Sequence, residues 1–549
     1  MSAPHLVLLH APGVYDFRQE AILCGPLADF AVSPLALERL PLSFASLTGY
    51  LEHGGYRVRV LNLARHMLED PAFDAEAAIA GPEPLAFGIS LHWLAQAQGA
   101  LAAAQLVKTF HLHTPVILMG LAAGYYHREL MDYPQVSCVL RGEPVGGALS
   151  ALLRALSSGE QPWCDVPGLT WRTRTGEVVE NALPAVAEDE AVDGPGPELE
   201  HGWGGCLPLA RQFISPFAVP LAARGCTQDC VVCHNSTSAS RRLYGSSVPT
   251  CRLPERLAGD LFVAHRQGHK TAYVVGDITQ AAPDYMSRFL QAVRLGRAPD
   301  LVCFDLFQPL SCRLLGDIVN SLPNAALDIV MHSPHAGIRQ AVGRHYGNAA
   351  IEQTIAYALA LGYARVRLYF TIGLPDQDYD AALSAAAYSE ELLTRFRGDR
   401  RLQPFVTPLA PFLDAGCSAF EEPERVGYHL SWRTLEEHRR ARLCPSWKHA
   451  LNYETRHMTR DDLARATYDV TLAMARLRAR HGMLSVQQVQ EVEQSVSLAR
   501  RLMEEIDLAV GEHDPDRVEY TLSRLKPQID EANRAGLKSQ NLLSALLLE

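Results

Sequence analysis

Three cysteines lie within eight residues of one another, at Cys226, Cys230 and Cys233, in the pattern C-x3-C-x2-C. This spacing lets three thiolates converge on one small inorganic core, and thiolates are the ligands that hold iron–sulfur clusters. Four thiolates would saturate a [4Fe-4S] cubane, whereas three leave one iron with an open position. An open position on a metal indicates chemistry rather than structural support. Gly225, directly before the first cysteine, allows the backbone to turn sharply there.

Two other uses of these cysteines have to be weighed. A structural zinc site needs a fourth ligand at short range, and His234, next to Cys233, would supply one. A disulfide cluster would require export, but the first residues lack a basic region followed by an apolar stretch. The remaining nine cysteines are scattered singly, which is typical of reduced thiols in a cytosol. We therefore favour a [4Fe-4S] cluster and expect a cytoplasmic protein.

The cluster segment, R-G-C-T-x-x-C-x-x-C from Arg224 to Cys233, resembles the cluster loop of the radical S-adenosylmethionine (SAM) superfamily. The resemblance implies that the amino and carboxylate groups of SAM chelate the open iron. It also implies that an electron from the cluster cleaves SAM to a 5′-deoxyadenosyl radical. An external electron donor of the flavodoxin or ferredoxin type is then an expected partner.

Length and charge limit the remaining classes. A chain of 549 residues is too long for one ordinary core, which predicts two to four domains. The apolar runs are far shorter than a membrane span, so we expect no transmembrane segment. The net charge of −11 argues against a nucleic acid as the main partner.

Residues 1–160 alternate between apolar strands and helical stretches. Strands are predicted at 6–9, 56–61, 85–90, 115–120 and 136–140, and helices at 43–53 and 95–110. This alternation predicts a Rossmann-like, doubly wound α/β sheet with a ligand at the carboxyl ends of the strands. No G-x-G-x-x-G follows the first strand, so a dinucleotide is not supported.

The order of features is similar to the cobalamin-binding domain that precedes many radical SAM domains. The first strand ends in His10-Ala11-Pro12, Leu40-Pro41-Leu42 precedes the first long helix, a later strand ends in Gly120, and Arg141-Gly142-Glu143 follows the last strand. The resemblance implies that cobalamin contacts His10, Pro12, Leu42, Ser90, Gly120, Gly142 and Glu143. The chain has no D-x-H-x-x-G, so no histidine of this domain is expected to ligate cobalt. The alternative is a Rossmann-like domain with another ligand or with none.

Residues 161–205 read as a hairpin that turns at Thr175-Gly176, followed by a linker rich in Glu, Asp, Gly and Pro. Residues 206–430 again alternate between strands and helices, with about six βα units. Six units predict a partial (βα)6 barrel rather than a closed eight-fold one, which is the core that the radical SAM resemblance implies.

Polar residues follow the predicted barrel strands, where side chains face the site. An acid suits the SAM ammonium or ribose, and a guanidinium suits the carboxylate. Gly276-Asp277 stands where the superfamily binds the amino group, and Asp305 or Gln308 is placed for the ribose. Arg339, beyond Ser333, is the candidate for the carboxylate. Gly373-Leu374-Pro375 matches a sixth-strand G-L-P motif of members that carry cobalamin domains.

Residues 431–549 change character and carry apolar residues at helical spacing, with helices predicted at 463–481, 486–510 and 514–535. We interpret them as a helical cap or an oligomerisation arm.

Our first hypothesis is a cobalamin-dependent radical SAM methyltransferase that uses methylcobalamin to methylate an unactivated carbon or a phosphinate phosphorus of a small molecule or peptide. A second hypothesis keeps the cofactors but ends in a rearrangement or cyclisation without methyl transfer. A third is a non-catalytic protein that binds cobalamin or responds to redox state. The residues do not identify the substrate.

Overall fold

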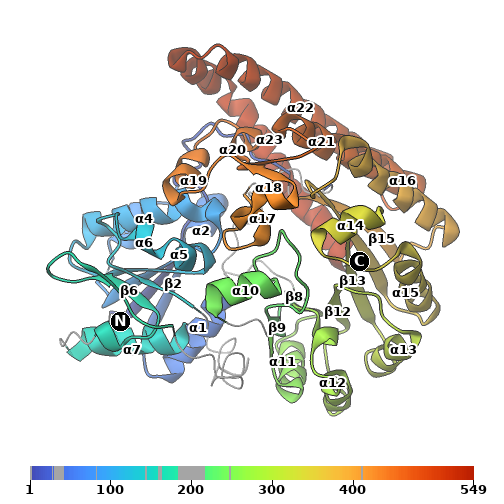
Figure 1. Ribbon diagram of the computed structural model, residues 1–549, viewed down its shortest axis with the longest axis horizontal. Coiled ribbons are helices and arrows are strands. Elements are labelled where there is room, and N and C mark those ends of the chain that lie inside the picture. Colours follow the sequence, from blue (N-terminus) through green and yellow to red (C-terminus); the bar gives the residue numbers. More distant parts are fainter. Residues whose placement is uncertain are drawn as a thin grey trace.

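The computed structural model describes residues 3–26, 29, 42–81, 83–142, 145–158, 163–183, 217–245, 249–409 and 412–548. Two units built on parallel sheets lie side by side, and the C-terminal helices extend across them (Figure 1). This arrangement confirms the predicted fold class: a Rossmann-like unit, a partial barrel and a C-terminal helical part.

The first unit is a seven-stranded sheet in the order β2-β1-β3-β4-β5-β6-β7. Its strands are β1 (Leu6–His10), β2 (Val58–Asn62), β3 (Ala86–Ser90), β4 (Val116–Met119), β5 (Cys138–Leu140), β6 (Leu169–Arg172) and β7 (Val178–Glu180). The first five strands are parallel, and the hairpin β6–β7 pairs antiparallel to β5. The hairpin that the sequence predicts ahead of the linker therefore extends this sheet.

Helices cover both faces of the first sheet. Helices α1 (Leu42–His53) and α7 (Gly146–Ser158) pack on the face that carries Leu6 and Leu8, and α4 (Ala97–Phe110) packs on the opposite face. Adjacent residues of a strand point to opposite faces, so the near-continuous apolar strands bury both of their faces, as parallel strands do.

The second unit is an open six-stranded parallel sheet in the order β15-β14-β13-β12-β11-β8. Its strands are β8 (Phe217–Ala218), β11 (Thr271–Val274), β12 (Leu301–Leu306), β13 (Ala325–His332), β14 (Arg365–Ile372) and β15 (Leu402–Pro408). The crossover helices are α11 (Pro254–Arg266), α12 (Tyr285–Val293), α13 (Cys312–Ser321), α15 (Asn348–Ala360) and α16 (Tyr379–Arg395).

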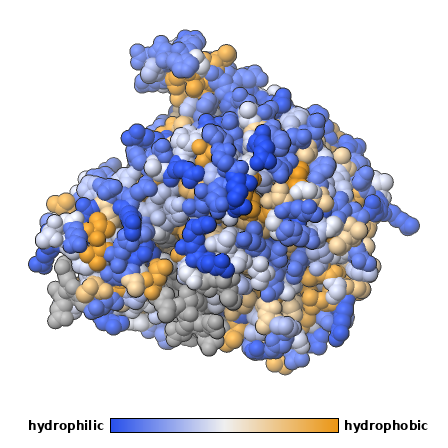
Figure 2. All heavy atoms as spheres, in the orientation of Figure 1, coloured by the Kyte–Doolittle hydropathy of each residue, from blue (hydrophilic) through white to orange (hydrophobic). Residues whose placement is uncertain are grey.

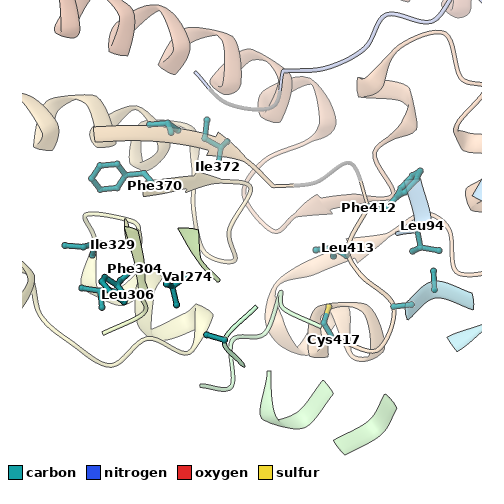
Figure 3. Packing of buried hydrophobic residues seen from close by; sticks show 14 of the residues in the cluster. Leu94, Val274, Phe304, Leu306, Ile329, Phe370, Ile372, Phe412, Leu413 and Cys417 are labelled. Atoms are coloured by element: carbon teal, nitrogen blue, oxygen red, sulfur yellow. The ribbon is translucent and has the colours of Figure 1, made fainter. Parts of the chain in front are cut away.

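One large hydrophobic cluster joins the two units. Apolar barrel residues such as Phe304, Ile329 and Phe370 point outward from their strands and are buried, while Leu94 of the first unit and Phe412 belong to the same cluster (Figure 3). Because the cluster is continuous, the two sheets share one core instead of meeting across a polar surface.

The C-terminal helices pack within the chain. Helix α21 (Arg460–Arg480) lies against α16 and β15, and α22 (Val486–Gly511) and α23 (Pro515–Leu548) form an antiparallel pair beyond it. Leu23, from the segment after β1, is buried among residues of these three helices. The predicted cap therefore covers both the barrel and an N-terminal segment.

The face of the molecule seen in Figure 2 is mostly hydrophilic, with hydrophobic residues in small groups. No helix in the described part of the chain combines the length and the apolar character needed to cross a membrane.

Candidate active site

The three cysteines lie in one loop at the carboxyl edge of the barrel sheet. The loop runs from β9 (Ala223–Arg224) to α10 (Thr237–Tyr244), and all three thiols are free. Within the described residues no three His, Cys, Asp or Glu side chains are close enough to hold a single metal ion. His234 Nδ1 lies 2.9 Å from Asp414 Oδ2, so this nitrogen is occupied away from the thiols.

Backbone contacts hold the cluster loop from two sides. Val231 donates its N–H to the carbonyl of Val342 at the end of α14 (Ala336–Val342), and Ala419 in α17 (Ser418–Glu421) donates to the carbonyl of Val231. Gly343 has a φ of +104°, and a Cβ added there would lie 2.8 Å from the carbonyl oxygen of Asp229. Only glycine allows α14 to end this close to the loop.

Gly343→Val is expected to displace the cluster loop, because a β-branched residue is strained at positive φ and its Cβ would overlap the backbone of Asp229. The cost should be about 2–4 kcal/mol in the free energy of unfolding, with a loss of bound iron. Gly347→Val is the matched control, because Gly347 has an ordinary extended φ and no neighbour within 4 Å. Urea unfolding and iron analysis measure both variants. Equal iron content in the two variants would contradict the anchoring role.

A buried arginine faces the cluster loop. Burial raises the pKa of all three thiols, that of Cys233 to about 12, while the charge of Arg344 opposes the rise at Cys226 and Cys230. Arg344 Nη1 also donates a 2.5 Å hydrogen bond to the carbonyl of Phe307. Buried neutral thiols are poor nucleophiles, whereas a metal cluster displaces their protons on binding, so this loop suits cluster binding better than covalent catalysis.

Arg339 does not fit its predicted role at the SAM carboxylate. Its side chain is completely buried and donates to the carbonyls of Ser333 and Tyr346 and to Oδ1 of Asn348. These bonds fix the turn around α14 and leave the guanidinium closed off from the site. Arg344, five residues later, lies next to the cluster cysteines and replaces Arg339 as our candidate.

Asp277 is also engaged within its own turn. Its carboxylate accepts hydrogen bonds from the N–H groups of Thr279 and Phe307 and from Gln280 Nε2. The neighbouring Gly276 donates its N–H to Asp305 Oδ2 at 2.9 Å. Asp277 therefore shapes the backbone at the end of β11, and its predicted contact with the SAM amino group stays a prediction.

The other predicted SAM residues lie at or near the carboxyl ends of barrel strands. Ser333 follows β13 and is buried, Gln308 follows β12, and Gly373 follows β14. Gly373 accepts a hydrogen bond at its carbonyl from the hydroxyl of Tyr428. Their contacts with SAM stay predictions.

The predicted cobalamin residues gather at the carboxyl edge of the first sheet. His10 and Ser90 end β1 and β3, Gly120 follows β4, and Gly142 follows β5. Gly120 has a φ of +120°, and a Cβ there would lie 2.8 Å from the carbonyl oxygen of Leu91. Gly120 is therefore needed to bring the loops after β3 and β4 together.

The remaining predicted cobalamin residues are Pro12, Leu42 and Glu143, and not all of them are fully described by the structure. Pro12 is buried, and its carbonyl oxygen lies where a Cβ on Gly99 would be, so the loop rests directly on α4. Leu42 is the first residue of α1, but its side chain lies outside the described residues, as does the whole of Glu143.

Among the described residues, two buried polar side chains on the α1 and α7 face find no hydrogen-bond partner. They are His10, with both ring nitrogens unbonded, and Thr48, with its hydroxyl unbonded. Burial lowers the pKa of His10 to about 4, so the ring is neutral at pH 7. Small residues lie on the same side: Gly88 beside Leu8, and Gly146 against the ring of Tyr50. Unpaired buried polar atoms are rare in native proteins and indicate that a polar ligand group completes this region.

The carboxyl edge of the first sheet contacts the cluster side of the barrel. The loop after β3 places Trp93 against His234 of the cluster loop, with ring centroids 4.9 Å apart. Nearby, the hydroxyl of Tyr126 donates to the carbonyl of Arg433, and Glu129 accepts from the N–H of Leu435 in α19 (Leu435–Ala441). These bonds fix the carboxyl edge of the first sheet against the cluster side of the barrel.

No protein-family model and no curated protein matches the sequence. Solved structures match over most of the chain. A structure described as the radical S-adenosylmethionine methyltransferase TsrM from Kitasatospora setae with cobalamin and a [4Fe-4S] cluster has a TM-score of 0.55 and 12% identity, covering 86% of this chain and 89% of that one. A second TsrM structure, with tryptophan substrate and a SAM analogue, has a TM-score of 0.51 and 15% identity, covering 78% of each chain.

The cobalamin-dependent S-adenosylmethionine radical enzyme OxsB, with aqua-cobalamin and S-adenosylmethionine bound, has a TM-score of 0.56 and 12% identity, covering 100% of this chain and 80% of that one. The chain has the fold of cobalamin-dependent radical SAM enzymes. Within this radical SAM fold, sequence reasoning did not find Trp93 or Thr48, and of the two arginines in the segment after β13 it chose Arg339 over Arg344. The sequence contains an arginine directly after Gly343, but only the geometry of α14 shows which of the two arginines turns toward the cluster loop.

Proposed function

We propose that this protein is a cobalamin-dependent radical SAM enzyme, and that it transfers a methyl group to an unactivated carbon or a phosphinate phosphorus. The observation that carries the proposal is the cluster loop, in which three free cysteines lie at the carboxyl edge of a six-stranded barrel and two of them, Cys226 and Cys230, lie close to the charge of Arg344. The shared fold with TsrM and OxsB supports the same reading.

The residues of the loop fit a [4Fe-4S] cluster with SAM on its open iron. Cys226, Cys230 and Cys233 would hold the cluster, and Arg344 would bind the SAM carboxylate with a charge-assisted hydrogen bond. Cobalamin supplies a transferable methyl group when bound, and SAM at the cluster supplies a radical that removes a substrate hydrogen. The chain's own task is to hold both cofactors against one substrate and to exclude water and other hydrogen donors.

The first unit fits cobalamin, because its unpartnered groups need a polar ligand. His10 and Thr48 would donate or accept hydrogen bonds with a buried polar part of the cofactor, and Ser90 lies at the same edge. Gly120 and Gly142 at the ends of neighbouring strands would leave room for the corrin ring.

His10→Phe is expected to weaken cobalamin binding about tenfold, because phenylalanine keeps a ring but cannot hydrogen-bond to the cofactor. The cofactor-free protein should be equally stable or more stable, since an unsatisfied buried polar group has been removed. A spectroscopic cobalamin titration and urea unfolding separate the two effects. Unchanged cobalamin affinity would remove His10 from the site.

His10→Phe should also change how the free energy of unfolding depends on pH. Folding lowers the pKa of His10 from 6.5 to about 4, so between these values the unfolded chain binds a proton that the folded chain does not. The contribution of His10 to the free energy of unfolding is therefore full above pH 6.5 and decreases as the pH falls toward 4. His10→Phe should lose this part of the acid sensitivity, as measured by unfolding at pH 7 and pH 5.

The decisive experiment is anaerobic purification with added cobalamin, followed by reaction with SAM and a reductant. We expect iron, sulfide and cobalamin absorbance, formation of 5′-deoxyadenosine and S-adenosylhomocysteine, and a product that has gained one carbon. Zinc in place of iron and sulfide, or failure of cobalamin to bind, would overturn the proposal. Absence of both SAM-derived products from a fully loaded protein would instead support a non-catalytic binding protein.

A second candidate keeps the cofactors but ends in a rearrangement or cyclisation without methyl transfer. OxsB is described as a radical enzyme and TsrM as a methyltransferase. The alignment with OxsB spans the whole chain, whereas the alignment with TsrM spans 86% of it, so a reaction other than methyl transfer is the second candidate. Product mass separates the two candidates, since only methylation adds a carbon. The electron donor is proposed to be of the flavodoxin or ferredoxin type, and the site of action the cytoplasm.

A further inference from the structure

The interior of the barrel is polar, although its outer face is apolar. Residues such as Val302, Phe304 and Leu306 point outward into the hydrophobic cluster, so the alternate positions of each strand point inward. Inward positions near the amino ends of the strands are satisfied: Arg367 makes a two-pronged ion pair with Asp328, at 2.6 and 3.0 Å. Arg367 also donates to the hydroxyl of Tyr273 at 2.8 Å. This group closes the lower end of the interior.

Level with this floor and above it, three polar side chains from three neighbouring strands keep unbonded atoms. They are Asp305 of β12, His332 of β13 and Tyr369 of β14. Asp305 Oδ2 accepts from Gly276 and His332 Nδ1 lies 3.1 Å from the hydroxyl of Thr371, but within the described chain no hydrogen bond reaches Asp305 Oδ1, His332 Nε2 or the Tyr369 hydroxyl. All three side chains are only partly buried, although protein surrounds them.

The backbone of His332 is strained. Its φ is +69°, in the left-handed region that a histidine rarely adopts, and the strand register shifts between Val330 and His332. A shift of this kind re-aims a side chain, and such strain is typical of functional positions. Burial and the nearby charge of Arg344 lower the pKa of His332 to about 3, so the imidazole is neutral.

Asp305 lies deep in the interior. It stands in register with Asp328 of the floor, four residues before the end of β13. Burial and the neighbouring carboxylates of Asp328 and Asp277 raise the pKa of Asp305 to about 7, so it is close to half protonated at neutral pH. Asp305 occupies an inward position of its strand, as His332 and Tyr369 do, so it would contact a substrate in this interior in place of the predicted SAM ribose.

We propose that the barrel interior binds the substrate, and that Asp305, His332 and Tyr369 recognise a hydroxyl or amine group on a small polar molecule. The proposal rests on the proposed function, because the substrate must lie where both cofactors can reach it. A carboxyl, a neutral imidazole and a phenol can donate and accept hydrogen bonds, but in this group they offer no positive charge to an anion. A lipid would leave these buried polar groups unpaired, which costs free energy.

The test uses the protein reconstituted with cluster and cobalamin and three matched six-carbon probes: glucosamine, glucose and gluconate. Saturation-transfer NMR should detect glucosamine and glucose, with gluconate bound at least about tenfold more weakly, since a site built for a hydroxyl or amine rejects an anion. Asp305→Asn keeps an acceptor but removes the charge. This variant should weaken the binding of glucosamine about tenfold if an ammonium is the preferred group. It should change the affinity for glucose by less than about threefold.

Tyr369→Phe should weaken both neutral and amine probes, and the exposed Asp300→Asn is the control that should change neither. Any of three results would overturn the proposal. These are gluconate binding as tightly as glucose, no binding of any of the three probes, and probe binding that neither interior variant changes. Cluster absorbance and 5′-deoxyadenosine formation are recorded in the same samples, so loss of the proposed function is distinguished from loss of substrate recognition.

A second measurement needs no ligand. Carbodiimide with glycinamide couples to accessible, protonated carboxyl groups, and peptide mass mapping locates the label. At pH 6.5 Asp305 should be labelled at least about tenfold faster than Asp328, whose carboxylate is paired with Arg367. Equal or slower labelling of Asp305 would show that the interior is closed and would overturn the proposal.

Discussion

Cys230→Ala is expected to abolish the iron–sulfur absorbance and all cleavage of SAM, while the first unit still binds cobalamin. Cys230 is the middle one of the three proposed ligands and is almost completely buried, so no water or neighbouring side chain can replace its thiolate without moving the loop. A cubane held by two thiolates has two uncovered irons and should be lost, leaving iron below about one-tenth of the wild-type content. Cobalamin should remain, because His10 and Ser90 lie on a different sheet.

Cys251→Ala is the matched control. Cys251 lies in β10 (Thr250–Cys251), which pairs with β9 directly before the cluster loop, and its thiol is partly buried like those of Cys226 and Cys233. It should keep full iron content and full formation of 5′-deoxyadenosine. Wild-type iron in Cys230→Ala, or equal losses in the two variants, would mean that the loop does not hold the cluster.

Arg478→Met is expected to lower the free energy of unfolding by about 3–5 kcal/mol, because it leaves the carboxylate of Asp29 buried without a counter-charge. The two side chains are 2% and 1% exposed and lie 2.7 Å apart. Arg478 also donates to the carbonyl of Pro404 at 2.6 Å and lies over the ring of Phe405 at 4.7 Å. The pair joins the N-terminal segment to α21 and to the last barrel strand.

Urea unfolding of Arg480→Met provides the comparison. Arg480 lies two residues away on the same helix and pairs with Glu390, but its side chain is 60% exposed. An exposed pair should contribute less than about 1 kcal/mol, so the two methionine variants should differ severalfold in their effect on stability. Adding Asp29→Asn to Arg478→Met should recover part of the loss, because it removes the unpaired charge. Equal effects of the two single variants would show that the buried ion pair contributes no more to the free energy of unfolding than the exposed pair.

Local patterns were sufficient to predict most of the fold. Apolar runs bounded by Gly and Pro placed the parallel strands within a few residues, as β1, β3 and β13 show. The position of the hairpin β6–β7 could not be predicted, because its pairing with β5 depends on a neighbour that is distant in sequence.

A cluster role for the three cysteines could be predicted because their spacing alone constrains the chemistry, and this role stays a prediction. The choice between Arg339 and Arg344 could not, because both follow β13 and both are arginines near the same turn. Gly343, in the left-handed conformation, reverses the chain at the end of α14, so that Arg339 turns into the protein and Arg344 turns toward the loop. The unpaired ring of His10 also depends on tertiary packing, which sequence periodicity does not report.

The burial of Leu23 beneath the C-terminal helices has a consequence for synthesis. Asn533 of α23 bonds the backbone of both Ile22 and Cys24, so an N-terminal segment waits for a partner made more than 500 residues later. During translation the first sheet can form early, but this segment keeps apolar groups uncovered until the ribosome has released nearly the whole chain. Chains cut short before α23 should therefore be retained by chaperones or degraded, even when both sheets are complete.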